Sequence, residues 1–277
     1  MDNRQKIALI TGATDGIGKA LAFKLAKENY EVVIIGRNPD KVKATVSELK
    51  SKKSNSLVSS ISADLSIMSE VKKATDIFLQ NHKQLDLLVL NANAIANERI
   101  ITTEGNEANF AIGYLSRVLM IHKLENVLEA THNSQIISVI GLDTAPVDFD
   151  DITIKKDFTG RKGLTRWQWA INLFIQDYNK KNKVPINFYM PGLVKTKILK
   201  NEPQPMRLFI QIMNVIMGIT PEKAAENMYQ VIEKITLTDK RNTTFSYAKE
   251  RKPLKIKTQL GDTEKLLTVT ESLLRKY

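Results

Sequence analysis

The chain has 277 residues, a formal net charge of +11 and no cysteine. This length supports one large α/β domain with a substantial core, and no linker rich in Ser, Gly or Pro divides residues 1–277, so we expect a single domain. The absence of cysteine excludes disulfides, thiolate nucleophiles and cysteine-ligated metals. The lysines are spread without interleaved aromatic residues, which argues against nucleic acid as the partner of the positive charge.

Three other features narrow the class of protein. The histidines, His82, His122 and His132, are scattered, so we expect no metal site and histidines that lie in solvent. No run reaches about 18 apolar residues, so we expect no transmembrane helix. The first expected strand begins so near Met1 that we also expect no cleavable signal or transit peptide.

The first strand and helix enclose a glycine-rich turn. A β-branched run predicts a strand at residues 7–10, and an amphipathic stretch predicts a helix at 19–27. Such a turn lets backbone N–H groups and the positive helix end approach a phosphate; an ordinary tight connection is the alternative. We expect a nucleotide pyrophosphate to bind at Gly12, Thr14, Asp15, Gly16, Ile17 and Gly18.

The second strand is expected at 31–35, and a Lys/Glu-rich helix follows to about residue 53. In dinucleotide-binding folds, an acidic residue about 20 positions after the glycines binds the adenosine ribose. Here that place falls on Gly36, with Arg37 and Asn38 beside it. A missing carboxylate and an adjacent guanidinium favour a 2′-phosphate, so we expect NADP(H) rather than NAD(H). The alternative for Arg37 is a solvated residue at a helix start.

The third and fourth strands are expected at 57–61 and 85–90, with a helix at 68–81 between them. Asp64 and Leu65 follow the third strand, where a carboxylate could accept a hydrogen bond from the adenine amino group or cap the next helix. Asn91 and Ala92 follow the fourth strand, which is apolar almost throughout, as a strand covered on both faces should be. A helix at 103–130 and a fifth strand at 135–140 come next.

The second half of the chain continues the alternation. We expect a long surface loop at 143–162, a helix at 165–182, a sixth strand at 184–190, a seventh at 243–248 and a terminal helix at 264–275. About seven strands with intervening helices predict a Rossmann-type doubly wound parallel sheet covered on both faces, with ligands at the carboxyl ends of the strands. Pro191, Gly192 and Thr196 leave the sixth strand at that edge.

An apolar helical insertion is expected at 200–220. The stretch from Leu208 to Ile219 is almost wholly apolar and too short to span a bilayer. It could lie at a membrane interface, cover a pocket or dock on a partner, or it could pack on its own domain.

Together these motifs resemble the short-chain dehydrogenase/reductase family, particularly its retinol dehydrogenase and hydroxysteroid dehydrogenase branches. The turn at 11–18 is similar to the family's phosphate loop, and Asp64 to its adenine-side aspartate. Asn91-Ala92 is similar to its Asn-Ala-Gly turn, and the loop from Pro191 to Thr196 to its nicotinamide-side loop. The resemblance implies a dinucleotide fold and cofactor contacts at these residues.

The residues that transfer the proton do not match the family. Its tyrosine needs a lowered pKa, which a lysine one helical turn later provides, and no tyrosine in this chain has a lysine four residues later. By the resemblance, the family's catalytic Asn, Ser, Tyr and Lys fall on Gly113, Gly141, Thr165 and Trp169. We expect no catalytic residue. The indole of Trp169 could fill the substrate space, contact the nicotinamide or pack in the core.

Two functions are compatible with motifs that match the family's cofactor site and proton-transfer residues that do not match. The first is a catalytically inactive NADP(H)-binding protein that serves as a structural or accessory subunit of a larger assembly. By analogy with superfamily members that hold a cofactor without turnover, a mitochondrial respiratory complex at the inner membrane is the expected setting. The alternative is an active NADPH-dependent carbonyl, retinoid or steroid oxidoreductase with a non-standard proton donor. A redox sensor would differ from the accessory subunit only in whether nucleotide changes its affinity for a partner.

Overall fold

The structure, a computed structural model, describes residues 4–52, 57–93, 96, 98–141, 144–195, 218–238, 240–252 and 255–277. In these ranges eight strands form one sheet in the order β3-β2-β1-β4-β5-β6-β7-β8. The strands are β1 (Ile7–Thr11), β2 (Glu31–Gly36), β3 (Val58–Ser62), β4 (Leu87–Leu90), β5 (Gln135–Val139), β6 (Ile186–Met190), β7 (Thr244–Ser246) and β8 (Lys249–Arg251). All neighbouring pairs are parallel except β7 and β8, which pair antiparallel.

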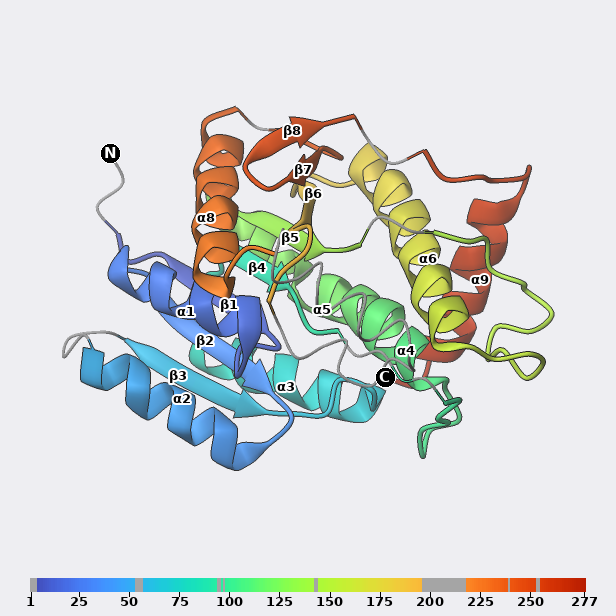
Figure 1. Cartoon of the computed structure of the whole chain (residues 1–277), viewed down its shortest axis with the longest axis horizontal. Helices are drawn as coiled ribbons and strands as arrows, with labels where there is room; N and C mark the ends of the chain where they lie inside the picture. The colour runs from blue at the N-terminus through green and yellow to red at the C-terminus, as the bar shows by residue number, and fades with distance from the viewer. Residues whose placement is uncertain are drawn as a thin grey trace.

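Helices cover both faces of this sheet (Figure 1). They are α1 (Gly16–Lys27), α2 (Pro39–Lys52), α3 (Met68–Asn81), α4 (Ala108–Phe110), the π-helix η1 (Ala111–Leu115), α5 (Ser116–Ala130), α6 (Gly160–Lys181), α8 (Pro221–Thr238) and α9 (Asp262–Leu274). On one face α1 packs against α8, and on the other α3 packs against α5. The C-terminal α9 packs on α6 at the outer edge of that second layer.

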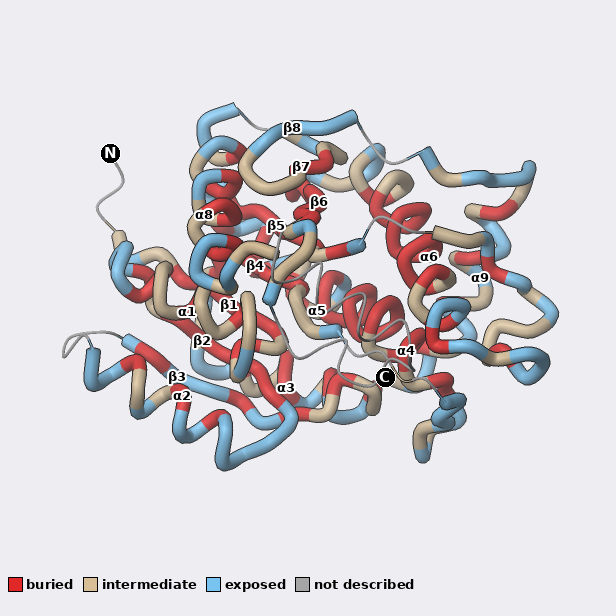
Figure 2. The backbone as a smooth tube through the Cα atoms, viewed as in Figure 1, coloured by how far each residue is buried: buried red, intermediate tan, exposed pale blue. Residues whose placement is uncertain are grey.

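The sheet divides the core into two layers, because alternate side chains of a strand point to opposite faces. Leu9 of β1 belongs to the cluster under α3, α5 and α6, whereas Ala8 and Ile10 belong to the cluster under α1 and α8. The buried stretches in Figure 2 follow the central strands and the inner sides of both helical layers. Burial on both faces explains why these strands are apolar almost throughout.

The order of the strands places a crevice between β1 and β4. The chain runs outward from β1 through β2 to β3, and then from β4 through β5 to β6 in the other direction. In open α/β sheets, loops at such a reversal diverge and leave room for a ligand beyond the carboxyl ends of the strands. The predicted doubly wound α/β fold is confirmed.

Several element boundaries differ from the sequence-based prediction, and the structure explains three of them. The helix predicted at 103–130 begins only at Ala108, because the residues before it form a turn in which Gly105 has a φ of +86°. The helix predicted from 165 begins at Gly160, where the Thr159 side chain caps it. The strand predicted at 243–248 is interrupted at Tyr247, whose φ of 56° reverses the chain, so an eighth strand follows.

Two predictions of solvent exposure hold only in part. The segment predicted as a surface loop at 143–162 is irregular and mostly exposed or half-buried over residues 144–159, but it buries Val147 and Ile154. His82, predicted to lie in solvent, stacks on Phe78 with ring centroids 4.6 Å apart, and its Nε2 lies 3.0 Å from Glu31. A neighbouring ring and a carboxylate thus supply the contacts that water would have made.

Other predictions concern segments that are only partly described. The apolar helical insertion predicted at 200–220 lies outside the described residues except for its last three positions, where Ile219 forms a bridge with Val194. No helix among the described residues is both long and apolar enough to cross a membrane. Across the same ranges, no group of three or more His, Cys, Asp or Glu residues could hold a metal ion.

The central strand β4 supplies a test of the fold. Leu88 is fully buried in the cluster under α3 and α5, so Leu88→Ala should lower the free energy of unfolding by about 2–5 kcal/mol through lost contacts and a cavity. Leu237→Ala is the matched control, because that side chain on α8 is 84% exposed and its loss should change stability by under about 0.5 kcal/mol. Urea unfolding followed by circular dichroism measures both. Equal losses in the two variants would contradict the placement of β4.

Candidate functional site

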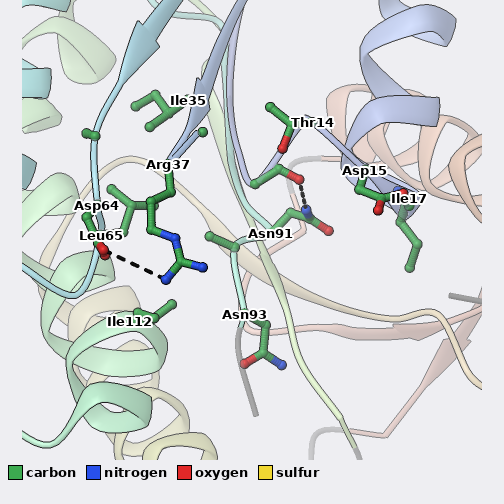
Figure 3. Close-up of a pocket in the computed structure, with 15 residues that line it drawn as sticks. Thr14, Asp15, Ile17, Ile35, Arg37, Asp64, Leu65, Asn91, Asn93 and Ile112 are labelled. Atoms are coloured by element: carbon green, nitrogen blue, oxygen red, sulfur yellow. Dashed lines mark hydrogen bonds and ion pairs between the residues drawn. The ribbon is translucent and has the colours of Figure 1, made fainter. Parts of the chain in front are cut away.

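A cavity of about 520 Å³ lies at the carboxyl ends of β1, β2, β3 and β4 (Figure 3). Its walls come from the turn before α1, the ends of β2 and β3, the turn after β4 and one residue of η1. The lining residues are Gly12, Thr14, Asp15, Gly16, Ile17, Ile35, Gly36, Arg37, Ala63, Asp64, Leu65, Asn91, Ala92, Asn93 and Ile112. The cavity therefore occupies the crevice that the strand order creates.

The turn before α1 is packed too closely for side chains. Gly12 and Gly16 have φ values of +66° and +55°, which favour glycine, and a Cβ on Gly12 would lie 2.8 Å from the Cα of Ala92. A Cβ on Gly18 would overlap the carbonyl oxygen of Gly12. Asp15 caps α1 by accepting a hydrogen bond of 2.8 Å from Gly16 N–H. The first turn of α1 thus faces the cavity with its positive dipole end.

Hydrogen bonds fix this turn to the end of β4. The Thr11 hydroxyl accepts from the N–H groups of Asn91 and Ala92 at 2.9 and 3.0 Å and donates to the Val89 carbonyl at 3.2 Å. In return, Asn91 Nδ2 donates to the carbonyls of Thr11 and Gly12, both at 3.1 Å. These bonds give the cavity a rigid floor.

The adenosine-side candidates Arg37 and Asp64 face each other across the cavity mouth, 3.8 Å apart (Figure 3). The Arg37 side chain is 75% exposed and points toward Asp64. One carboxylate oxygen of Asp64 accepts from the N–H and hydroxyl of Ser66, at 2.9 and 2.8 Å, and so closes the turn before α3. The other oxygen is the one that faces Arg37.

Most of the predicted cofactor-contact residues line this cavity. Among the others, Gly18 lies behind the turn, and the Asn38 side chain accepts from Lys41 N–H at the start of α2. Pro191 and Gly192 do not line it, and Thr196 lies outside the described residues. The lining residues outside the predicted contact set are Ile35, Gly36, Ala63, Asn93 and Ile112. The first four lie within two residues of predicted contacts, whereas only the fold brings Ile112 to the cavity.

Two of the four positions assigned to proton transfer are glycines that lie beside α6. A Cβ on Gly113 would overlap the indole of Trp167, so that ring occupies the space a side chain there would need. At the end of β5, the N–H of Gly141 donates to the side-chain oxygen of Gln168, and a Cβ on Gly141 would lie 2.8 Å from it. The Trp167 indole thus fills the space beside Gly113, which is buried, whereas Gly141 is exposed and its neighbour on α6 is the end of the Gln168 side chain.

The other two positions lie on α6 itself. Thr165 is buried, and its hydroxyl donates to the Lys162 carbonyl at 3.3 Å. The Trp169 indole is fully buried; its Nε1–H donates to the Lys257 carbonyl at 2.7 Å, and its ring meets Phe149 edge-on. Of the three roles considered for Trp169, core packing is the one that these contacts support. Gly113 and Gly141 lie beside α6 through Trp167 and Gln168, and Thr165 and Trp169 belong to that same helix.

A buried cation lies beside them. Arg117 on α5 is 2% exposed; its Nη1 donates to the Ser138 hydroxyl and the Val139 carbonyl, both at 2.8 Å, and its Nη2 to the Ala92 carbonyl at 3.1 Å. The guanidinium lies 4.8 Å from the centre of the Trp167 ring. Sequence reasoning missed Arg117, because only the fold shows that an arginine in the middle of a helix is buried.

The described tyrosines that are buried are poor proton donors. Burial raises the pKa of Tyr30, Tyr114, Tyr178 and Tyr189 above the ordinary phenol value, and it raises that of the half-buried Tyr229 to about 12. A catalytic tyrosine needs a shift in the opposite direction, toward the working pH. Tyr247 lies closest to the expected nicotinamide side, because a Cβ on Gly192 would overlap its hydroxyl.

Comparison with known structures agrees with this fold. An alcohol dehydrogenase from the archaeon Thermococcus sibiricus, solved with 5-hydroxy-NADP, superposes with a TM-score of 0.66 and 19% identity over 92% of this chain and all of that one. A short chain dehydrogenase/reductase from Burkholderia phymatum, solved with NAD, gives 0.66 and 18% over 89% of each chain. At these identities the likeness shows the fold.

Sequence comparison finds more closely related proteins. Human polyprenol dehydrogenase is 26% identical over 79% of this chain and 70% of its own length, and human retinol dehydrogenase 13 is 24% identical over 70% of this chain and 60% of its own. The match therefore leaves about a third of each relative uncovered. Residues 6–145 match the model of the family described as short chain dehydrogenase. Because that match covers half of the sequence and includes the glycine turn and the whole cavity lining, this chain belongs to the short-chain dehydrogenase family.

Proposed function

We propose that this protein holds NADP(H) in the cavity without turning it over, as the cofactor-bearing accessory subunit of a larger assembly. One observation carries the proposal. The cavity and its glycine turn are built as a dinucleotide requires, while the four positions assigned to proton transfer hold Gly113, Gly141, Thr165 and Trp169, none of which carries an acidic or basic side chain. A site that binds the cofactor and lacks an acid or base suits a structural or sensing role.

The residues of the cavity fit the dinucleotide part by part. The close approach of Gly12 to Ala92 leaves a smooth cradle for the phosphates at the start of α1. Arg37 and Asp64 would hold the adenosine half, and the ends of β4 and β5 lie where the nicotinamide half would extend. Bound NADPH would supply a hydride donor there. The exposed guanidinium of Arg37 supports NADP(H) over NAD(H), because it can pair with a 2′-phosphate.

The proposed setting is a mitochondrial respiratory complex at the inner membrane. It is supported by the resemblance to superfamily members that hold a cofactor in such complexes without turnover. The experiment is to measure the native size of the tagged endogenous protein after gentle solubilisation and to identify its bound nucleotide by mass spectrometry. Migration far above a small homo-oligomer, with NADP(H) retained, is the expected result. A free monomer or dimer would contradict the accessory role.

A second candidate function is NADPH-dependent reduction of a carbonyl, retinoid or steroid with a non-standard proton donor. The names of the polyprenol and retinol dehydrogenase relatives favour it, and so does the hydroxyl of Tyr247, which lies against Gly192 at the expected nicotinamide side. Tyr247→Phe removes only that hydroxyl. If the wild-type protein reduces a carbonyl and Tyr247→Phe does not, this second function is the correct one.

The first proposal predicts binding without turnover. NADPH should raise the unfolding midpoint of the purified protein, because a ligand that binds only the folded state stabilises it. NADPH should not be oxidised above the protein-free rate with a panel of aldehydes and ketones that includes retinal, since losing general acid–base catalysis alone costs about 10²- to 10⁴-fold in rate. Absorbance at the dihydronicotinamide band measures this. Oxidation of many equivalents of NADPH per chain would contradict it.

A second prediction concerns the 2′-phosphate. Arg37→Ala should weaken NADPH binding by about 10-fold and leave NADH binding unchanged, because only NADPH carries the group that Arg37 would pair with. Arg251→Ala is the control, since this exposed arginine on β8 lies far from the cavity in the sheet order. Isothermal titration calorimetry gives the four dissociation constants. An equal loss of affinity for both nucleotides would show that Arg37 does not recognise the 2′-phosphate.

A third prediction concerns the filled proton-transfer space. Gly113→Asn should cost about 1–3 kcal/mol of stability by overpacking against Trp167, and Trp167→Ala about 3–5 kcal/mol by leaving a cavity. The double variant should lose less than the sum of the two by at least about 0.5 kcal/mol, because the Asn side chain then fits the space of the indole. Leu237→Asn is the control, since that side chain on α8 is 84% exposed and an Asn there needs no buried space. Strict additivity in chemical denaturation would contradict this packing.

A further inference from the structure

The buried guanidinium of Arg117 is held entirely by neutral groups. Its three hydrogen bonds go to the Ser138 hydroxyl and to the carbonyls of Val139 and Ala92, and its Nε has no hydrogen-bond partner. Its remaining close neighbour is the face of the Trp167 ring. Among the described residues it forms no ion pair with a carboxylate. A full positive charge thus lies in the interior without a counter-charge.

This charge is present at neutral pH. Burial lowers the pKa of Arg117 from the ordinary arginine value to about 9, which still leaves the group protonated near pH 7. The surrounding carbonyl oxygens stabilise the charge only in part. Its field extends into the neighbouring space with little screening, because side chains and not water surround it.

The nearest functional space is the cavity. Ala92 lines the cavity and also accepts a hydrogen bond from Arg117, so the guanidinium lies directly behind the cavity wall. It also contacts Val139 at the carboxyl end of β5, on the side of β4 away from Arg37 and Asp64. A dinucleotide whose adenosine half lies at β2 and β3 would extend its nicotinamide half toward this end of the crevice.

We propose that Arg117 makes the cavity select the reduced dinucleotide, NADPH, over the oxidised one, NADP⁺. The two ligands share every part except the nicotinamide ring, which is neutral when reduced and carries a positive charge when oxidised. A buried cation behind the wall at that end opposes the charged ring and not the neutral one. This inference rests on the proposed binding of NADP(H), and it assigns Arg117 as a specificity residue for the redox state.

The wild-type protein alone tests the proposal with three ligands. Isothermal titration calorimetry compares NADPH, NADP⁺ and 2′-phospho-ADP-ribose, which lacks the ring. NADPH should bind about 10-fold more tightly than NADP⁺, equivalent to about 1.4 kcal/mol. NADP⁺ should bind no better than the ligand without the ring. Equal affinities for NADPH and NADP⁺ would overturn the proposal.

Substitutions then assign the preference to the charge. Arg117→Gln keeps hydrogen-bond donors and removes the charge, so the NADPH to NADP⁺ affinity ratio should fall to about 2 or less, with 2′-phospho-ADP-ribose unaffected. Arg117→Lys keeps the charge and should keep the ratio. Ser138→Ala removes one hydrogen bond of the guanidinium and leaves its charge, so it should keep the ratio too. A ratio that survives in a folded Arg117→Gln, or is lost in both charge-retaining variants, would contradict the assignment.

The outcomes separate this inference from the function on which it rests. If none of the three ligands binds, the proposed cofactor function fails and the selectivity with it. If all three bind and the two redox forms bind equally, the cofactor function stands and the role of Arg117 fails. If Arg117→Gln does not fold, the wild-type comparison and the Arg117→Lys variant still decide, because both keep the charge.

Discussion

The hydroxyl of Thr11 joins the two halves of the sheet at the point where the strand order reverses. It accepts two N–H groups from the turn after β4 and donates to the Val89 carbonyl, and Asn91 returns two bonds to the glycine turn. Buried networks of this kind are rigid when every member is satisfied. Because the phosphate-side turn and the end of β4 are fixed to each other, everything that approaches the crevice meets one preformed surface.

The same network continues one residue further, to Ala92, and through its carbonyl to Arg117 and the end of β5. The floor of the crevice is therefore linked from β1 to β5 by side chains that all act on backbone groups. The two ends of the crevice differ in how closely they are packed. On the adenosine side, small and polar residues leave an open cavity, whereas beside Gly113 the Trp167 ring of α6 fills the space. One half of the crevice is thus shaped for binding and the other for packing.

The sequence was sufficient to predict an element where its residue pattern is compatible with only one local structure. Apolar runs between glycine turns predict the central strands, and the glycine turn itself predicts the phosphate side of the cavity, because φ values near +60° leave few other residues possible. The sequence was insufficient where contacts between residues distant in the chain determine the burial or position of a side chain. The burial of Arg117, the contact of Ile112 with the cavity and the reversal at Tyr247 each depend on which elements the fold brings together. The contacts of His82 with the Glu31 carboxylate and the Phe78 ring are of the same kind.

The overlap between position 113 and the Trp167 ring also limits how this sequence can change. No side chain larger than hydrogen fits at position 113 while the indole is in place, and removing the indole first leaves a large void. A substitution at Gly113 alone or at Trp167 alone therefore lowers stability, although the two substitutions together need not. Because natural domains are only marginally stable, such an intermediate is disfavoured. In evolution, this packing disfavours single substitutions at either position, whatever selection acts on the cavity beside it.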